Sequence, residues 1–190
     1  MTTKCFKKIH NVWYGVVLDD SKSVLSCGFT INGKKSITKS VLSSLPTGLS
    51  IQETPSNKYA LTILESSSLI YEGKDPKAIP EFTWERLPKF YRKALKLTAM
   101  IPKGKVATYA NIAKGIGEPK SARAVGNAEA SNPFAPFVPC HRVISSSLGL
   151  GGYGGGLDLK RELLNKEGII FVKNHVAREC VCIPNANKSL

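Results

Sequence analysis

The stretch "TYANIAKGIGEPKSARAVGNAEA", residues 108–130, contains two short helical patterns joined by a tight turn. Thr108 is a typical N-cap for the first helix, and Gly117 is a typical stop. The first helix has one apolar face, formed by Ile112, Ala113 and Ile116. The second helix is expected to carry Pro119 at its first position. The pattern predicts a helix-turn-helix, although helical hairpins that bind nothing share it.

The second of these helices is built almost entirely from small residues. Arg123 and Asn127 lie four residues apart and therefore share a face. Two interpretations stay open from these residues. The helix either packs tightly against its neighbours with Arg123 in solvent, or it enters a nucleic-acid groove and presents Arg123 to it.

The composition of the 190-residue chain is typical of a soluble globular protein, with 42% hydrophobic and 22% charged residues. The 27 Lys and Arg residues outnumber the 14 Asp and Glu residues, giving a formal net charge of +13. This excess of positive charge favours binding to a polyanion, most often a nucleic acid, because neutralising phosphates releases counterions. The alternative is a soluble protein whose surface is basic without such a partner. The five cysteines are an odd number, which favours free thiols over a disulfide framework. With no apparent signal peptide or membrane span, we expect a cytoplasmic protein, or a nuclear one if eukaryotic.

The N-terminal part reads mainly as short strands. Residues 12–20 and 23–33 are rich in β-branched and aromatic residues and are expected to form a hairpin, and a helix is expected at 35–45. A connector rich in Pro and Lys then places a domain boundary near residue 80. Beyond it, a helical pattern is interrupted at Pro88, where a proline kinks or restarts a helix.

The stretch "NPFAPFVPCHRVIS", residues 132–145, places a proline at every third position before a cysteine and a histidine. Because proline fixes φ and restricts the preceding residue, the segment is expected to be extended and to deliver Cys140 at the start of a strand. A rigid approach suits a nucleophile that must be held still. Successive side chains of a strand point to opposite sides, so contact between Cys140 and His141 would require a bound water or a bend at Cys140.

Two segments follow this cysteine. The stretch "SSSLGLGGYGGGLD", residues 145–158, is either a flexible loop or a pocket wall with Tyr153 against a planar ligand. Residues 157–168 read as a helix closed by Gly168, which places Glu167 at the C-terminus, where the macrodipole disfavours a negative charge. A residue that stands where the helix dipole disfavours it is a candidate for a functional role. The alternative is that Glu167 is an exposed glutamate, which would tolerate this position at little cost.

Five separated motifs together resemble the O6-alkylguanine-DNA alkyltransferase family. They are "GKVATYANIA" at 104–113, "SARAVGNA" at 121–128, "PCHRV" at 139–143, "GYGGG" at 152–156 and "LLNKEG" at 163–168. The resemblance covers roughly residues 80–172 closely. It implies an α/β fold: a small sheet-containing N-terminal domain at 1–80, with a structural role, then a mainly helical alkyltransferase domain with the helix-turn-helix at 81–172. Residues 173–190 form a tail beyond the family core.

The resemblance implies that the protein reverses DNA alkylation by an irreversible, stoichiometric transfer. Cys140 would be the nucleophile, His141 its base through a water molecule, and Glu167 the group that orients His141. Tyr109 would help to flip the damaged base and donate a proton to it, and Asn132 would support the helix-turn-helix loop. The residues implied in DNA binding are Lys120, Ala122, Arg123 as an intercalating finger, Asn127 and again Tyr109. The guanine pocket would be lined by Val143, Tyr153 and Gly154, the last standing where many members of the family carry serine.

The partner implied by the resemblance is double-stranded DNA containing O6-alkylguanine, bound through the minor groove by a monomer, with no membrane and no cofactor. No metal site is expected, since His175, Cys180 and Cys182 are too few and too irregularly spaced to bind one.

Two alternative functions are a non-catalytic binder of alkylated bases and a DNA-binding regulator that senses thiol chemistry. The lesion binders of the family carry tryptophan at the cysteine position, so Cys140 argues against the first. A regulator would read bases with polar side chains, whereas the residues around Arg123 are small.

Overall fold

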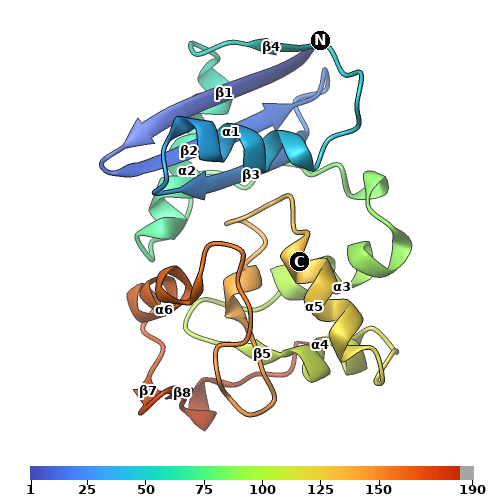
Figure 1. Cartoon of the computed structure of the whole chain (residues 1–190), viewed down its shortest axis with the longest axis vertical. Helices are drawn as coiled ribbons and strands as arrows, with labels where there is room; N and C mark the ends of the chain where they lie inside the picture. Colours follow the sequence, from blue (N-terminus) through green and yellow to red (C-terminus); the bar gives the residue numbers. More distant parts are fainter. Residues whose placement is uncertain (185–190) are drawn as a thin grey trace. The chain divides into compact units, whose positions relative to one another are not determined.

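The structure, a computed structural model, describes residues 1–184 and divides into two compact units (Figure 1). The first unit contains Met1–Arg86 together with Pro133–Phe137, and the second contains Leu87–Asn132 and the chain from Val138 on. The division therefore follows Arg86, a few residues beyond the boundary that the sequence suggests. The return of residues 133–137 to the first unit was not anticipated.

The first unit contains a four-stranded sheet in the order β3-β2-β1-β4. Its strands are β1 (Thr2–Ile9), β2 (Val12–Leu18), β3 (Val24–Thr30) and β4 (Ile51–Glu53). The predicted hairpin is confirmed: β2 and β3 pair antiparallel, and the backbone N–H of Ser23 donates to Asp19 Oδ1 in the turn. The sequence did not indicate β1, which pairs antiparallel with β2, or β4, which pairs parallel with β1.

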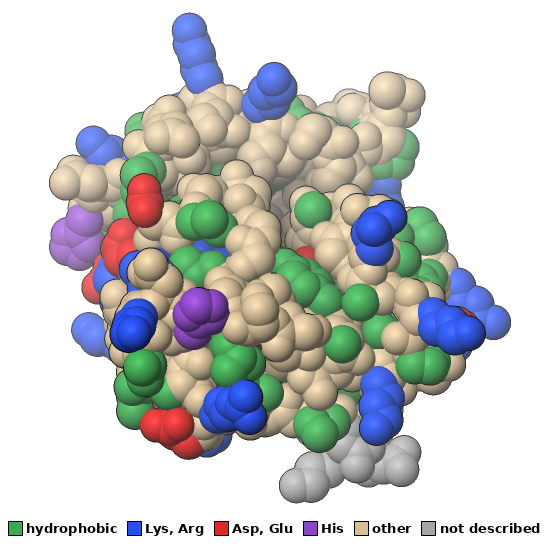
Figure 2. Space-filling model, turned by 60° about the horizontal axis from the view of Figure 1, so that its bottom comes forward, with side chains coloured by type: hydrophobic (Ala, Val, Ile, Leu, Met, Phe, Trp, Pro, Cys, Tyr) green, Lys and Arg blue, Asp and Glu red, His purple; other side chains and the backbone are tan. Residues whose placement is uncertain are grey.

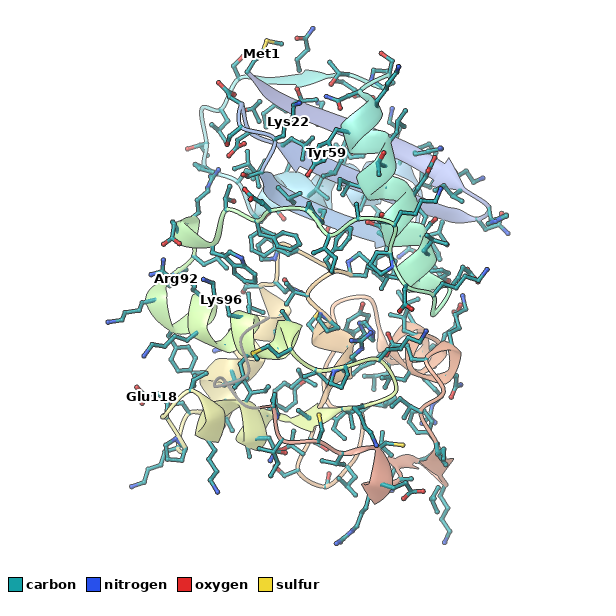
Figure 3. The ribbon with its side chains drawn as sticks, turned by 180° about the vertical axis from the view of Figure 1, so that it is seen from behind. Met1, Lys22, Tyr59, Arg92, Lys96 and Glu118 are labelled. Carbon is teal, nitrogen blue, oxygen red and sulfur yellow. The ribbon has the colours of Figure 1, made fainter. Side chains whose placement is uncertain are left out.

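Two helices cover opposite faces of this sheet, as the front and back views show (Figures 1 and 3). The predicted helix is α1 (Lys34–Ser43), which buries Ile37 and Val41 against the sheet. On the other face lies α2 (Lys58–Tyr71), whose first turn is capped by the side chain of Asn57. The unit is thus a three-layer α/β arrangement, as the fold class implied.

The second unit is mainly helical. Its helices are α3 (Lys89–Ala99), α4 (Tyr109–Gly115), α5 (Ala122–Ala130) and α6 (Leu157–Lys166). Two short ladders join β5 (Ala107–Thr108) with β6 (Val143–Ile144), and β7 (Phe171–Val172) with β8 (His175–Val176). The restart predicted at Pro88 is confirmed, because Pro88 is the N-cap of α3. A core of buried apolar residues lies among these elements, including Leu97, Ile101, Ile112, Val125 and Val143.

The predicted helix-turn-helix consists of α4 and α5, with Glu118 in the intervening turn (Figure 3). The side chain of Thr108 accepts from the backbone N–H of Asn111, so the predicted N-cap is confirmed. Gly117 has φ of +81°, which confirms it as the stop. The expectation for Pro119 is wrong. The backbone N–H of Ser121 donates to Glu118 O across a turn that contains Pro119, so α5 begins only at Ala122.

The proline-rich segment is not extended, and Cys140 does not begin a strand. Residues 133–138 form turns around Phe134, which is buried against the rings of Phe82 and Trp84. Cys140–Arg142 is a single 3-10 turn, and strand β6 begins only at Val143. The expectation failed because proline fixes φ but leaves ψ free, so burial of the intervening aromatic ring decides the path of the chain.

The predicted tail begins within the β7–β8 hairpin and continues through a 3-10 turn at Arg178–Cys180. It packs on the second unit: Val106 N–H donates to Cys180 O, and Cys182 N–H donates to Val106 O. Residues 185–190 of the tail lie outside the part of the chain that the structure describes. Among residues 1–184, no helix has the length and apolar character needed to cross a bilayer.

Candidate active site

The thiol of Cys140 lies buried in the 3-10 turn that precedes β6. The turn is closed by backbone hydrogen bonds from Cys140 N–H to Val138 O, 2.9 Å, and from Arg142 N–H to Pro139 O, 2.8 Å. Burial, followed by the charge of Glu129, raises the pKa of Cys140 to about 11. Because this value lies well above neutral pH, the resting thiol is protonated and needs a proton acceptor before it can attack.

His141, the residue that follows Cys140 in the chain, lies in direct contact with Glu167. Nε2 of His141 is 2.9 Å from Oε1 of Glu167, and both side chains are buried. Because a carboxylate only accepts hydrogen bonds, Nε2 carries the proton and Nδ1 keeps the lone pair. Burial lowers the pKa of His141, although Glu167 opposes this shift. The imidazole is therefore uncharged near neutral pH and is able to accept a proton.

Arg142 completes the array around Glu167, and sequence reasoning missed it. Its Nε donates to Oε2 and its Nη2 to Oε1 of Glu167, each at 2.8 Å, while its Nη1 donates to Ile101 O at 2.6 Å. Burial alone would raise the pKa of Glu167, but the hydrogen bonds and charges of His141 and Arg142 outweigh it and lower the pKa to about 2. Glu167 is the C-cap of α6, and this bidentate pairing compensates for the unfavourable helix end.

Tyr109 opens α4 and packs closely on the glycine-rich loop. Its hydroxyl lies 3.4 Å from Gly152 O, to which it donates. A Cβ at Gly151, where φ is +69°, would lie 3.0 Å from a ring carbon of Tyr109, so this close approach requires glycine. Burial, then the charges of Glu129 and Cys140, raise the pKa of Tyr109, which keeps its hydroxyl protonated and able to donate.

Lys160 was also missed, although it is fully buried on α6. Its Nζ donates to the carbonyls of Val143 and Leu150, both at 2.6 Å, and to Gly152 at 3.2 Å. Lys160 thereby ties the strand after the thiol to the glycine-rich loop. Burial lowers its pKa to about 8, while its charge lowers the pKa of Cys140. The spacing in the sequence indicated this burial: Lys160 lies four residues before Leu164, which is buried, and residues four apart share one face of a helix.

Glu129 is the third ionisable residue of the site that sequence reasoning missed. It is buried on α5, and Oγ1 of Thr98 donates to its Oε1 at 2.6 Å. Burial raises the pKa of Glu129 to about 7, although Thr98 and Lys160 oppose this shift. Glu129 lies four residues after the buried Val125 and therefore on the same face of the helix, a spacing from which its burial could have been predicted.

The remaining pocket residues lie near the thiol or in the loop. Asn132 donates from Nδ2 to Val138 O at 2.8 Å and hydrogen-bonds the thiol of Cys140, which ties the end of the helix-turn-helix to the nucleophile. Val143 is buried, and Tyr153 is half-buried with Lys160 Nζ 6.0 Å from its ring centroid. Gly154 is exposed, and a Cβ there would meet nothing within 4 Å. A serine side chain at this position would therefore fit.

The residues expected to bind DNA lie on the outside of the helix-turn-helix. Lys120, Arg123 and Asn127 are exposed, and Ala122 is partly exposed. On the face drawn in Figure 2, Lys and Arg side chains predominate over Asp and Glu, in agreement with the excess of positive charge. Within residues 1–184, no three His, Cys, Asp or Glu side chains are grouped as a metal site requires.

Comparisons with known proteins agree on one family. The model of the 6-O-methylguanine DNA methyltransferase, DNA binding domain, matches residues 89–169. A methylated-DNA–protein-cysteine methyltransferase of Methanosarcina acetivorans is 47% identical over 94 residues, covering 50% of this chain and 57% of that relative. In this and similar matches the chain spans about half the length of the relative. A protein of the same name from Thermococcus gammatolerans is 34% identical over 163 residues, covering 84% of this chain and 90% of that protein.

Solved structures extend the likeness to both units. The crystal structure of Mycobacterium tuberculosis OGT in complex with DNA superposes with a TM-score of 0.69 at 26% identity, covering 87% of this chain and 92% of that one. The O6-methylguanine-DNA methyltransferase of Pyrococcus kodakaraensis superposes with a TM-score of 0.66 at 25% identity, covering 89% and 100%.

Proposed function

Because this chain belongs to the methylated-DNA–protein-cysteine methyltransferase family, we propose that it repairs DNA by transferring an alkyl group from O6-alkylguanine to Cys140. The observation that carries the proposal is that the buried Cys140 is followed directly in the chain by His141 and Arg142, which both hydrogen-bond Glu167. A cysteine with only a packing role needs no such neighbours, whereas a nucleophile with a raised pKa does.

The first step of the proposed reaction is the removal of the proton from the Cys140 thiol. His141 is uncharged, and its Nε2–H is held by Glu167, so Nδ1 is the acceptor that can take the proton of Cys140 through one water molecule. The ionised Glu167 stabilises the imidazolium that forms. Arg142 in turn keeps Glu167 ionised and fixed.

The transfer itself is a displacement at the alkyl carbon. The Cys140 thiolate forms the new S–C bond as the bond from carbon to guanine O6 breaks, and the bonding electrons remain on the guanine. The hydroxyl of Tyr109, kept protonated by its surroundings, donates a proton to the departing base. The proton taken up by His141 then restores Tyr109, so the net change is a thioether on Cys140 and an unmodified guanine.

The product implies a single turnover. To remove the alkyl group, a nucleophile would have to attack its carbon and displace the Cys140 thiolate, and a neutral thioether does not undergo this displacement by water or side chains near neutral pH. Each chain therefore accepts one alkyl group and is consumed.

DNA is proposed to bind along α5 through the minor groove. Arg123 and Asn127 are exposed on one face of a helix whose other solvent-accessible residues are alanine or glycine, which permits close approach to a groove. Because O6 is out of reach in the base stack, the damaged nucleotide is flipped out, and Arg123 fills the space that it leaves. The DNA complex of the M. tuberculosis relative supports this choice of partner.

The test is a mixture of the protein with a duplex containing one O6-methylguanine, followed by intact-mass and peptide analysis. We expect one methyl group on the peptide containing Cys140, and none in the Cys140→Ala variant. An unchanged mass with retained binding of the duplex would contradict the proposal and leave a lesion binder or regulator in its place.

A further inference from the structure

Glu129 is a buried acid that the transfer mechanism does not use. It lies on the inner side of α5, the helix that exposes Arg123, and only 7% of its surface is exposed. One carboxyl oxygen, Oε1, accepts a hydrogen bond from Thr98 at 2.6 Å. The other, Oε2, is buried without a hydrogen-bond partner among the described residues. An ionised carboxylate in this state is costly, which favours the neutral acid.

The groups that interact with Glu129 lie on four different elements. Thr98 lies on α3, Tyr109 on α4, Cys140 in the 3-10 turn and Lys160 on α6. Glu129 is close enough that its charge raises the pKa of both Cys140 and Tyr109. The charges of Cys140 and Glu129 both raise the pKa of Lys160, against the larger effect of burial.

Resting on the proposed function, we propose that Glu129 is a positioning residue for the transfer. As an uncharged acid held by Thr98 it permits Cys140 to ionise, and as a carboxylate it opposes the thiolate. It touches neither substrate nor reacting atom in this role and acts only through Cys140.

The charge balance of the buried site explains this coupling. Below its own pKa of about 8, Lys160 brings one positive charge to this side of the site and compensates one negative charge there. That negative charge resides either on Glu129 or on Cys140, since two like charges in a buried site oppose each other. Glu129, with a pKa of about 7, gains its charge first as the pH rises. The thiolate is therefore suppressed above neutral pH.

The experiment measures two rates between pH 5.5 and 7.5, where Glu129 titrates and Lys160 keeps its charge. One is single-turnover methyl transfer from the O6-methylguanine duplex, and the other is alkylation of Cys140 by iodoacetamide, followed by peptide mass. The variant Glu129→Gln keeps an oxygen for Thr98 but carries no charge. We expect its rates to equal those of the unmodified protein at pH 5.5 and to exceed them roughly two- to threefold at pH 7.5, the effect of a shift of about half to one unit in the pKa of the thiol when about three quarters of Glu129 is ionised.

Two further variants separate the charge effect from a change in packing. Glu118→Gln removes an exposed charge next to α5 and is expected to leave the rate of iodoacetamide alkylation unchanged at every pH. Thr98→Val removes the hydrogen bond that lowers the pKa of Glu129. In this variant the suppression should therefore begin at a higher pH, and this test remains if Glu129→Gln does not fold.

A ratio of the Glu129→Gln and unmodified rates that is constant across the pH range would overturn the proposal, because a purely structural change does not follow the ionisation of Glu129. An unshifted profile in Thr98→Val would do the same. If iodoacetamide shows the coupling but no methyl group is transferred from the duplex, the proposed function fails while the link between Glu129 and Cys140 stands.

Discussion

Replacing Glu167 by glutamine removes the charge that orders the array around His141. In the structure one carboxylate accepts three hydrogen bonds, one from His141 and two from Arg142. Its pKa falls from 4.5 to about 2, and a shift of about 2.5 units corresponds to roughly 3 kcal/mol of stability. Breaking a buried ion pair destabilises by about 3–5 kcal/mol, which agrees. We therefore expect Glu167→Gln to lower the free energy of unfolding by about 3 kcal/mol at pH 7.

Urea denaturation at a series of pH values measures this difference. The folded-state pKa of Glu167 is depressed, so its stabilisation is fully present above about pH 4.5 and is lost as the pH falls toward 2. Because glutamine does not titrate, the two proteins should converge as the pH is lowered from 7 to 3.

The matched control is Glu162→Gln on the same helix. Glu162 is half-exposed and pairs with Lys166 at 3.0 Å, so its loss should change stability by less than about 0.5 kcal/mol. A loss below about 1 kcal/mol for Glu167→Gln at pH 7, or a difference that does not vary with pH, would refute the reasoning.

Four further substitutions test the site and its support. Thr108→Ala removes the N-cap of α4 and should reduce the free energy of unfolding by about 1 kcal/mol, measured by urea denaturation. Gly151→Ala forces a side chain into a positive-φ position against a neighbouring ring, and should cost about 1–3 kcal/mol in the same measurement. Lys160→Met removes the charge that lowers the pKa of Cys140, so alkylation of this thiol by iodoacetamide should slow. Arg123→Ala should weaken binding and transfer from the O6-methylguanine duplex, measured by titration and single-turnover kinetics, while stability changes by less than about 0.5 kcal/mol.

The sequence predicted best those features that short-range chemistry determines. Thr108 caps α4 through atoms three residues away, and Gly117 and Gly168 end helices through their own positive φ. The β2–β3 hairpin likewise depends on a local turn at Asp19. In each case the signal and the structure that it specifies lie within a few residues of each other.

The path of the chain before Cys140 could not be read in this way. Pro133, Pro136 and Pro139 fix local φ angles, but the direction of the segment depends on Phe134, whose ring packs on residues about 50 positions earlier in the chain. Strand β1 was missed for a related reason. Its side chains are mostly half-exposed, so it lacks the alternation of buried and exposed residues that marks a strand, and it is defined by its pairing with β2.

The two buried glutamates of the site show why residue type and burial alone do not decide function. Glu167 and Glu129 are equally exposed, at 7% each, yet the pKa of the first is lowered to about 2 and that of the second is raised to about 7. The difference follows from the number of hydrogen-bond donors. Glu167 receives three, two of them from a guanidinium, whereas Glu129 receives one from a hydroxyl. Environments that push two carboxyl pKa values apart assign them different roles. The permanently charged Glu167 can therefore orient His141, and only Glu129 can change its charge near neutral pH.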